Sequence, residues 1–183
     1  MEEKTEDVFV TYSNETNDFN TQVYSFVDLL RMNGFNAFCD ESEKQKTSSA
    51  SFSEIMTRGL QADKVIVVLS RGYKIKAENG KGGVGTEYKT ISDELRRNKD
   101  KYIFVSFERL TDDVIESITP MLFKSHYIID LTKDEDNGYA ELFSKIRSEH
   151  YRQFAKVSNK KVAIKPIQNP RFSLKKKDAK GME

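Results

Sequence analysis

The chain has 183 residues, of which 37% are hydrophobic and 32% are charged, enough for one well-buried domain with a segment left over. The 30 Lys and Arg residues nearly balance the 29 Asp and Glu residues, so no overall field favours nucleic acid, a membrane surface or an acidic substrate. One cysteine and two distant histidines predict neither a disulfide nor a metal site, and without a signal or membrane-spanning pattern we expect a cytoplasmic protein.

Apolar runs and helical periodicities alternate along the first part of the chain. Residues 7–12 form a nearly continuous apolar and β-branched run, which predicts a strand buried on both faces. Apolar residues at helical spacing predict a helix over 19–33, and residues 35–39 predict a second strand. The polar, Ser-rich segment that begins at Ser42 and ends at Ser51 is predicted to be an exposed, mobile loop.

The same alternation continues to about residue 155. A helix is predicted over 52–60, the clearest buried strand over 65–69, and a glycine-rich loop over 73–85. The remaining predicted elements are a helix over 88–97, a strand over 102–107, a short helix over 114–118, a strand over 127–131 and a helix from 139 to about 155. This order predicts an α/β fold: a flavodoxin-like, doubly wound sheet of five parallel strands, in the order 2-1-3-4-5, with helices on both faces.

The composition changes near residue 157. From Lys156 onward the chain is rich in Lys and Arg, contains Asp178 and Glu183 as its acidic residues, and loses its apolar periodicity. We therefore predict a domain over 1–157 and a basic, flexible tail or linker over 158–183. The domain itself carries no nucleic-acid-binding motif.

The stretch "GKGGVGTEYKTISDEL" superficially matches a phosphate-binding loop. Such a loop needs a Lys for the outer phosphates and then a Ser or Thr for magnesium, but Thr86 and Glu87 occupy those positions. Residues 70–79 also separate the glycines from the strand that such a loop follows directly. Both departures argue against a nucleotide triphosphate site of this type.

Candidate site residues follow from the predicted fold, because doubly wound sheets bind ligands at the carboxyl ends of their strands. The residues that the chain places at those ends are Tyr12, Ser13, Asp40, Ser70, Arg71, Tyr73 and Glu87. Each also has a structural interpretation: Tyr12 as a core aromatic, and Glu87 as a first-turn residue that complements a helix dipole. The acidic cluster of a magnesium-binding receiver domain is not found there.

Three segments resemble the TIR (Toll/interleukin-1 receptor) domains and the related SEFIR domains, over about residues 7–155. "DVFVTYS" is similar to their opening box, and "ADKVIVVLSRGY" to their third strand with its Ser-x-x-Tyr. "GVGTEYKTISDEL" is similar to the segment that carries the glutamate of TIR enzymes. The glycines before Glu87 are closer to the SEFIR pattern, since many TIR domains have Trp-Cys there and this chain has no Trp.

The resemblance implies an NAD⁺ glycohydrolase that cleaves the bond between nicotinamide and ribose, with NAD⁺ as substrate and no cofactor. Glu87 would be the catalytic carboxylate, stabilising the positive charge that develops on the ribose. The substrate-binding roles would be stacking by Tyr12, hydrogen bonding by Ser13, a phosphate contact by Arg71, shaping of the loop by Ser70 and Tyr73, and an undefined polar role for Asp40. Such an enzyme would be a defence or cell-death effector that self-association activates.

The same resemblance implies an alternative function, a non-catalytic signalling adaptor. TIR and SEFIR domains also associate homotypically, mainly through the loop after the second strand, here Ser42 to Ser51. The missing Trp-Cys and the Thr86 beside Glu87 keep this alternative open.

Overall fold

The computed structural model describes residues 4–174 of the chain. Its strands are β1 (Asp7–Thr11), β2 (Asn36–Phe38), β3 (Lys64–Val68), β4 (Tyr102–Ser106) and β5 (Ile128–Asp130). Its α-helices are α1 (Asn17–Met32), α2 (Asp40–Lys44), α3 (Phe52–Leu60), α4 (Arg71–Glu78), α5 (Gly82–Glu94), α6 (Asp112–Ile118), α7 (Leu131–Asp134) and α8 (Ala140–Arg147). Short 3-10 helices, η1 (Met121–Phe123) and η2 (Glu135–Asn137), lie on either side of β5 in the sequence.

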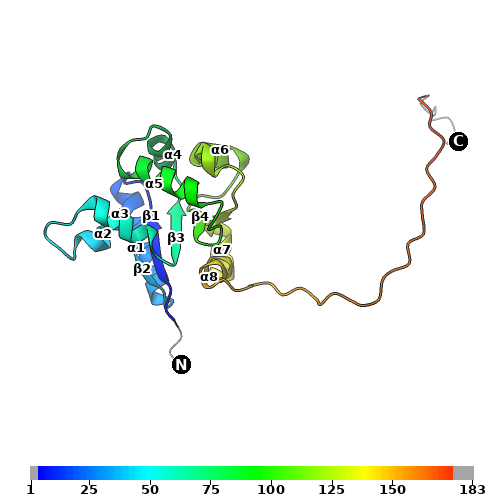
Figure 1. The fold of residues 1–183 in the computed structure, drawn as a ribbon, viewed down its shortest axis with the longest axis horizontal. Coiled ribbons are helices and arrows are strands. Elements are labelled where there is room, and N and C mark those ends of the chain that lie inside the picture. The colour runs from blue at the N-terminus through cyan, green and yellow to red at the C-terminus, as the bar shows by residue number, and fades with distance from the viewer. Residues whose placement is uncertain (1–3, 175–183) are drawn as a thin grey trace. The chain divides into compact units, whose positions relative to one another are not determined.

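The strands form one parallel sheet in the order β2-β1-β3-β4-β5 (Figure 1). Parallel neighbours need a connection that crosses back over the sheet, and helices supply each of these connections. The predicted α/β fold, a flavodoxin-like sheet with this strand order, is therefore confirmed. The order reverses between β1 and β3, which places a crevice at the carboxyl ends of these two strands.

Alternate side chains of each strand enter two separate cores. Val8 and Val10 of β1 contact the core that α1 and α8 cover, whereas Phe9 lies in the core covered by α3, α4 and α5. Successive side chains of a strand point to opposite faces, so a strand covered on both sides is buried along its whole length, as β3 is. This explains why the strands read as continuous apolar runs.

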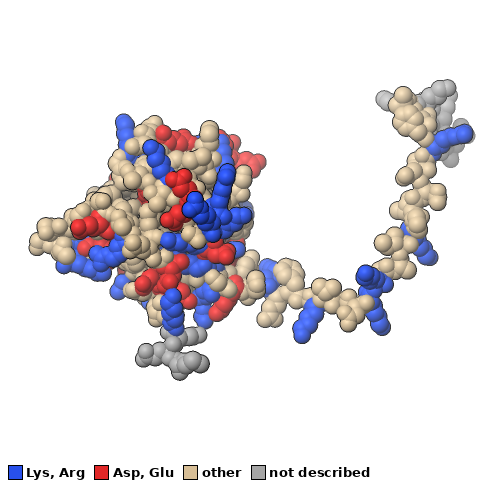
Figure 2. Space-filling view, viewed as in Figure 1, with Lys and Arg blue, Asp and Glu red and all other residues tan. Residues whose placement is uncertain are grey.

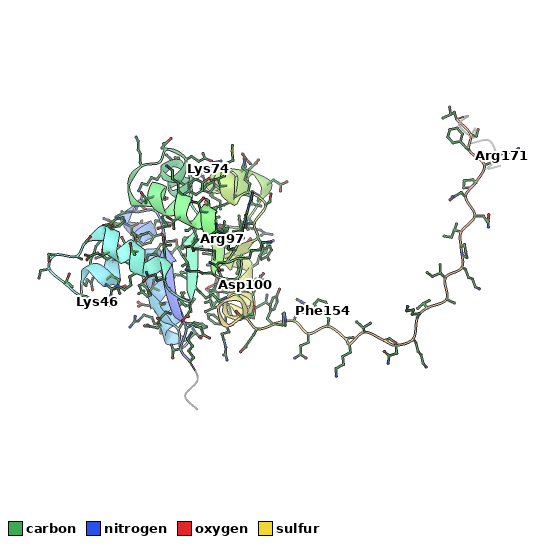
Figure 3. The ribbon with its side chains drawn as sticks, in the orientation of Figure 1. Lys46, Lys74, Arg97, Asp100, Phe154 and Arg171 are labelled. Carbon is green, nitrogen blue, oxygen red and sulfur yellow. The ribbon has the colours of Figure 1, made fainter. Side chains whose placement is uncertain are left out.

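The polar segment from Ser42 to Ser51 begins inside a helix, so the prediction of an exposed loop was wrong for its first residues, which belong to α2. Glu43 is buried, with Lys46 at 2.6 Å and Arg58 at 3.3 Å from its carboxylate. These two cations neutralise the charge of the Glu43 carboxylate, which the sequence pattern predicts to be exposed to solvent. Figure 3 shows Lys46 on the turn that follows α2.

The predicted glycine-rich loop over 73–85 was also wrong, because α4 and the first turn of α5 occupy most of it. Ser70 starts α4 by accepting a hydrogen bond from the Tyr73 N–H at 3.1 Å. A Cβ on Gly85 would overlap the backbone of Gly80. Gly85 therefore allows α5 to pack closely against the turn that follows α4.

The last helix of the domain ends earlier than the predicted residue 155. α8 ends at Arg147, and Ser148 adopts the left-handed conformation with φ of 56°. Contacts divide the chain into one compact unit over Met1–Arg152 and a second over Gln153–Glu183. Residues 153–174 of the second unit contain no helix or strand, and Phe154 and Arg171 lie in it (Figure 3). The domain limit at residue 157 stays a prediction.

Charged side chains of both signs are interspersed over the face of the domain shown in Figure 2. Within residues 4–174, no helix has the length and apolar character needed to cross a membrane.

Candidate functional site

Glu87 lies in the interior of α5 and points into the protein. The helix begins at Gly82, so the expectation that Glu87 occupies a first turn was wrong. Ile91, four residues after Glu87, is also buried, so these two side chains lie on the same core-facing side of α5. Glu87 therefore belongs to the apolar side of its helix, and only 3% of the residue is exposed.

Two hydroxyl groups hold the Glu87 carboxyl group. Thr11 Oγ1, at the end of β1, lies 2.7 Å from Oε1 and 2.8 Å from Oε2, and the Tyr73 hydroxyl of α4 donates to Oε1 at 3.0 Å. A threonine hydroxyl has one proton, so it donates to one of the two oxygens at a time. No cation among the described residues forms an ion pair with this carboxyl group.

Burial raises the pKa of Glu87 from 4.5 to about 7. The hydrogen bonds from Thr11 and Tyr73 oppose this rise, and the nearby charge of Asp40 adds to it. Burial, together with the Glu87 charge, also raises the pKa of Tyr73 well above its ordinary value, so its hydroxyl stays protonated and able to donate. Glu87 is therefore a carboxyl group that changes charge near neutral pH.

Two hollows meet Glu87. The larger has a volume of about 500 Å³ and lies between α3 and α5, with Phe52, Met56 and Gly83 in its wall. The smaller, of about 20 Å³, has room for about one water molecule and is lined in part by Tyr12 and Asp40. Phe52, Met56 and Glu87 line both hollows, so these side chains form the boundary between them.

Phe52 lies directly over α5 because position 83 is glycine. A Cβ on Gly83 would overlap the Phe52 ring. The ring is partly exposed, so it covers the route from solvent to Glu87 without being fixed in a core. The larger hollow is thus open to solvent, whereas the carboxyl group at its base is covered.

The structure brings Tyr12 and Asp40 to the same small hollow as Glu87. Tyr12 is buried, its hydroxyl lies 3.3 Å from that of Tyr24, and burial raises its pKa far above the ordinary value. Asp40 begins α2, where Lys44 pairs with it at 3.1 Å. Tyr12 is therefore a core aromatic residue that also borders the small hollow. The two interpretations of its sequence position, a core residue and a residue at the site, both describe its location.

Ser13, Ser70 and Arg71 lie outside these two hollows. Ser13 is completely buried, and its hydroxyl has no hydrogen-bond partner among residues 4–174. Ser70 caps α4 and donates to Glu15 at 2.5 Å. Arg71 is exposed and pairs with Glu108 at 2.7 Å.

Sequence reasoning missed four residues of this site: Thr11, Phe52, Met56 and Gly83. Thr11 ends β1 at the ligand-binding edge of the sheet, which was a usable signal. The contact between Phe52 and Gly83 had no signal, because it joins two helices that are distant in sequence.

The model of the SEFIR domain family matches residues 6–158 of the chain. The crystal structure of a prokaryotic SEFIR domain is similar to 84% of this chain and 100% of its own, with 24% identity and a TM-score of 0.62. The SEFIR domain of IL-17 receptor B covers 78% of this chain and 97% of its own, with 19% identity and a TM-score of 0.47. The TIR domains of the activated Roq1 resistosome, which directly recognises the pathogen effector XopQ, cover 79% and 80%, with 17% identity and a TM-score of 0.46. No curated protein matches the chain.

Proposed function

The chain belongs to the SEFIR domain family, and from that premise we propose that it is an NAD⁺ glycohydrolase whose catalytic carboxylate is Glu87. The observation that carries the proposal is a buried carboxyl group, with its pKa raised to about 7, beside a hollow of about 500 Å³. Buried carboxyl groups without a cationic partner destabilise a fold. Their presence beside a hollow at the carboxyl edge of a doubly wound sheet favours a functional role.

The chemistry needs few protein groups. When the bond between the ribose C1′ and the nicotinamide nitrogen breaks, its electron pair neutralises the cationic ring, so no acid has to protonate the leaving group. Positive charge then spreads over C1′ and the ring oxygen of the ribose, where an ionised Glu87 would stabilise it. Water adds at C1′ and releases a proton, which gives ADP-ribose and nicotinamide.

The raised pKa of Glu87 couples its charge to the substrate. Near neutral pH, part of the protein carries a protonated Glu87, and a cationic nicotinamide ring placed beside it would favour the ionised form. Binding of NAD⁺ would thus release a proton from that fraction. Thr11 and Tyr73 would remain as donors that hold the ionised carboxylate in place.

Access to Glu87 supports activation by self-association. A dinucleotide fits the larger hollow in size, and Glu87 borders that hollow, but only 3% of Glu87 is exposed, so Phe52 and Met56 would have to move for its carboxyl group to contact the substrate fully. Both residues belong to α3, which follows the segment that begins at Ser42 and ends at Ser51. Contacts between copies of the domain through that segment would shift α3 and uncover Glu87, as expected of a defence or cell-death effector.

The test is nicotinamide release from NAD⁺ by the purified protein, both dilute and tethered into clusters. The Glu87→Gln variant keeps the size and polarity of the side chain but cannot become an anion, so release should stop. Asp93→Asn removes an exposed carboxylate from the same helix and should leave release unchanged. Equal release by wild type and Glu87→Gln would refute the assignment.

The second candidate function is a signalling adaptor that works by homotypic contacts between domains. The observation that favours it is the near-complete burial of Glu87, with two donors in place and Phe52 near it. In that case Glu87 would only join β1, α4 and α5. Absence of turnover in clustered wild-type protein, together with self-association that a Lys46→Glu change weakens, would favour this function.

A further inference from the structure

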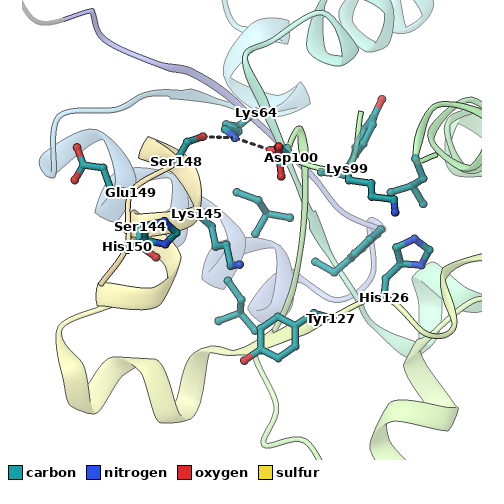
Figure 4. Close-up of a pocket in the computed structure, with 15 residues that line it drawn as sticks. Lys64, Lys99, Asp100, His126, Tyr127, Ser144, Lys145, Ser148, Glu149 and His150 are labelled. Carbon is teal, nitrogen blue, oxygen red and sulfur yellow. Dashed lines mark hydrogen bonds between the residues drawn. The ribbon is translucent and has the colours of Figure 1, made fainter. Parts of the chain in front are cut away.

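A further hollow, separate from the two that meet Glu87, lies at the opposite edge of the sheet. It has a volume of about 370 Å³ and lies where β3, β4 and β5 begin, with α8 as another wall (Figure 4). Lys64 and Tyr102, the first residues of β3 and β4, both line it. Because the strands are parallel, their amino ends and the carboxyl ends near Glu87 are separate edges. This amino-edge hollow is therefore not part of the site described above.

Basic side chains line the amino-edge hollow from several directions. They are Lys64 of β3, Lys99 of the turn before β4, His126 before β5, Lys145 of α8 and His150 after it. In Figure 4, Lys99 and Lys145 lie on opposite sides of the hollow. Neither of these two lysines forms an ion pair with any carboxylate in the described part of the chain.

Acidic side chains do not balance this charge. The acidic residues in the wall are Asp100 and Glu149, and Glu149 pairs with Arg147 at 3.2 Å. The three lysines in the wall therefore leave an excess of positive charge even when the histidines are neutral. A concave surface with an excess of positively charged side chains raises the local concentration of anions.

Lys64 is the buried member of this group. Its ammonium donates to the Asp100 carbonyl oxygen at 2.5 Å and to the Ser148 hydroxyl at 3.0 Å, both neutral acceptors (Figure 4). Burial lowers the pKa of Lys64, the charges of Asp100, Asp63 and Glu6 oppose this effect, and the charge of Lys145 adds to it. An ammonium has three N–H donors, so one remains for a ligand. A buried cation without a contacting carboxylate is stabilised when an anion binds beside it.

We propose that the amino-edge hollow binds the phosphate group of a small molecule, held by Lys64, Lys99 and Lys145. Lysine binds phosphate as a compact point charge and needs no fixed geometry. The volume lies at the lower end of the range of about 300–1,000 Å³ for small-molecule sites, which excludes a large ligand. Ile103 and Ile129, which belong to the core on the α8 face of the sheet, supply an apolar wall against which a ring attached to the phosphate can lie.

The proposal does not depend on NAD⁺ cleavage, and it is tested by isothermal titration calorimetry at fixed ionic strength. The probes are AMP, inorganic phosphate and uncharged adenosine. The test variant is Lys99→Gln with Lys145→Gln, two exposed positions outside the hydrophobic cores. The control is Lys89→Gln with Lys133→Gln, which removes the same charge from exposed positions outside the amino-edge hollow.

AMP should bind wild type and control alike, and bind the test variant about tenfold more weakly or worse, as expected for lost charge-assisted hydrogen bonds. Glu87→Gln should bind AMP as wild type does, which separates this hollow from the proposed active site. Tighter binding of AMP than of phosphate identifies a phosphate ester, and equal binding identifies free phosphate. Absence of saturable binding at millimolar concentration, unchanged binding by the test variant, or equal binding of adenosine would overturn the proposal.

Discussion

The hydroxyl group of Thr11 lies within 2.8 Å of both carboxyl oxygens of Glu87, although 76 residues separate them in the chain. The contact joins the carboxyl end of β1 to the interior of α5, across the point where the strand order reverses. It holds a carboxyl group that burial would otherwise keep protonated even more strongly. The pKa of Glu87 therefore reports both the burial of its carboxyl group and the hydrogen bonds that the carboxyl group accepts.

Replacing Thr11 with Val should raise the pKa of Glu87 by roughly one unit, because a hydrogen bond to the ionised form is lost at nearly constant volume. Tyr73→Phe should raise it by less, because the Thr11 bond contributes more to lowering this pKa. Titration of the Glu87 side-chain carbon by NMR measures both shifts. A lower pKa in either variant, or a larger shift in Tyr73→Phe, would contradict this account of the contact.

The Glu87→Gln variant should be more stable than wild type at alkaline pH. The pKa of Glu87 rises from 4.5 to about 7 on folding, so the folded form binds the proton more tightly. Stability from this group is present below pH 4.5 and is lost as the pH rises to about 7, by about 3 kcal/mol in total. Glutamine does not ionise, so the free energy of unfolding of the variant lacks this decrease with pH.

Urea unfolding at about pH 5 and about pH 8 checks this prediction. The difference between variant and wild type should grow by about 2.5 kcal/mol from about pH 5 to about pH 8, because a small part of the contribution is already lost at the lower pH. Asp93→Asn, on the exposed side of the same helix, should show no such growth. A difference that stays constant with pH would mean that Glu87 is ordinarily acidic in the folded protein.

Gly83→Ala should uncover Glu87. The added methyl group would meet the Phe52 ring, which is partly exposed and free to rotate away, whereas the helix itself tolerates alanine well. Water would then reach the carboxyl group, and its pKa should fall toward the ordinary value. The same NMR titration measures this change, and nicotinamide release by dilute protein should increase. An unchanged pKa would show that Phe52 does not limit access.

The fold was predictable because its strands are covered on both faces. The continuous apolar runs of β1 and β3 identify central parallel strands, and helical spacing between them identifies the crossovers. The helices α4 and α5, which occupy the glycine-rich segment, were not predictable from the sequence pattern, because glycine disfavours the helical conformation. The close approach of Gly85 to the Gly80 backbone, which no local rule describes, overrides that preference.

The site was predictable in part. The strand ends identify the edge of the sheet at which Tyr12, Asp40 and Glu87 line one small hollow, and their roles in binding or catalysis stay predictions. The pairing of Glu87 with Thr11 and Tyr73 depends on the exact placement of α4 and α5, whose boundaries the sequence pattern misjudged. Arg71 lies two residues before Tyr73 in the sequence, but α4 turns the Arg71 side chain outward, and it pairs with Glu108 at the surface. Its contact with a substrate phosphate stays a prediction.

The pH dependence of nicotinamide release by clustered wild-type protein tests the central claim most directly. If an ionised Glu87 is required, kcat/KM should rise with pH and level off above about 7, the pKa of this group in the free protein. The midpoint for kcat should lie lower, because the cationic substrate favours the ionised carboxylate. A kcat/KM that is flat across this range, the same profile in Glu87→Gln, or no release at all would contradict the claim.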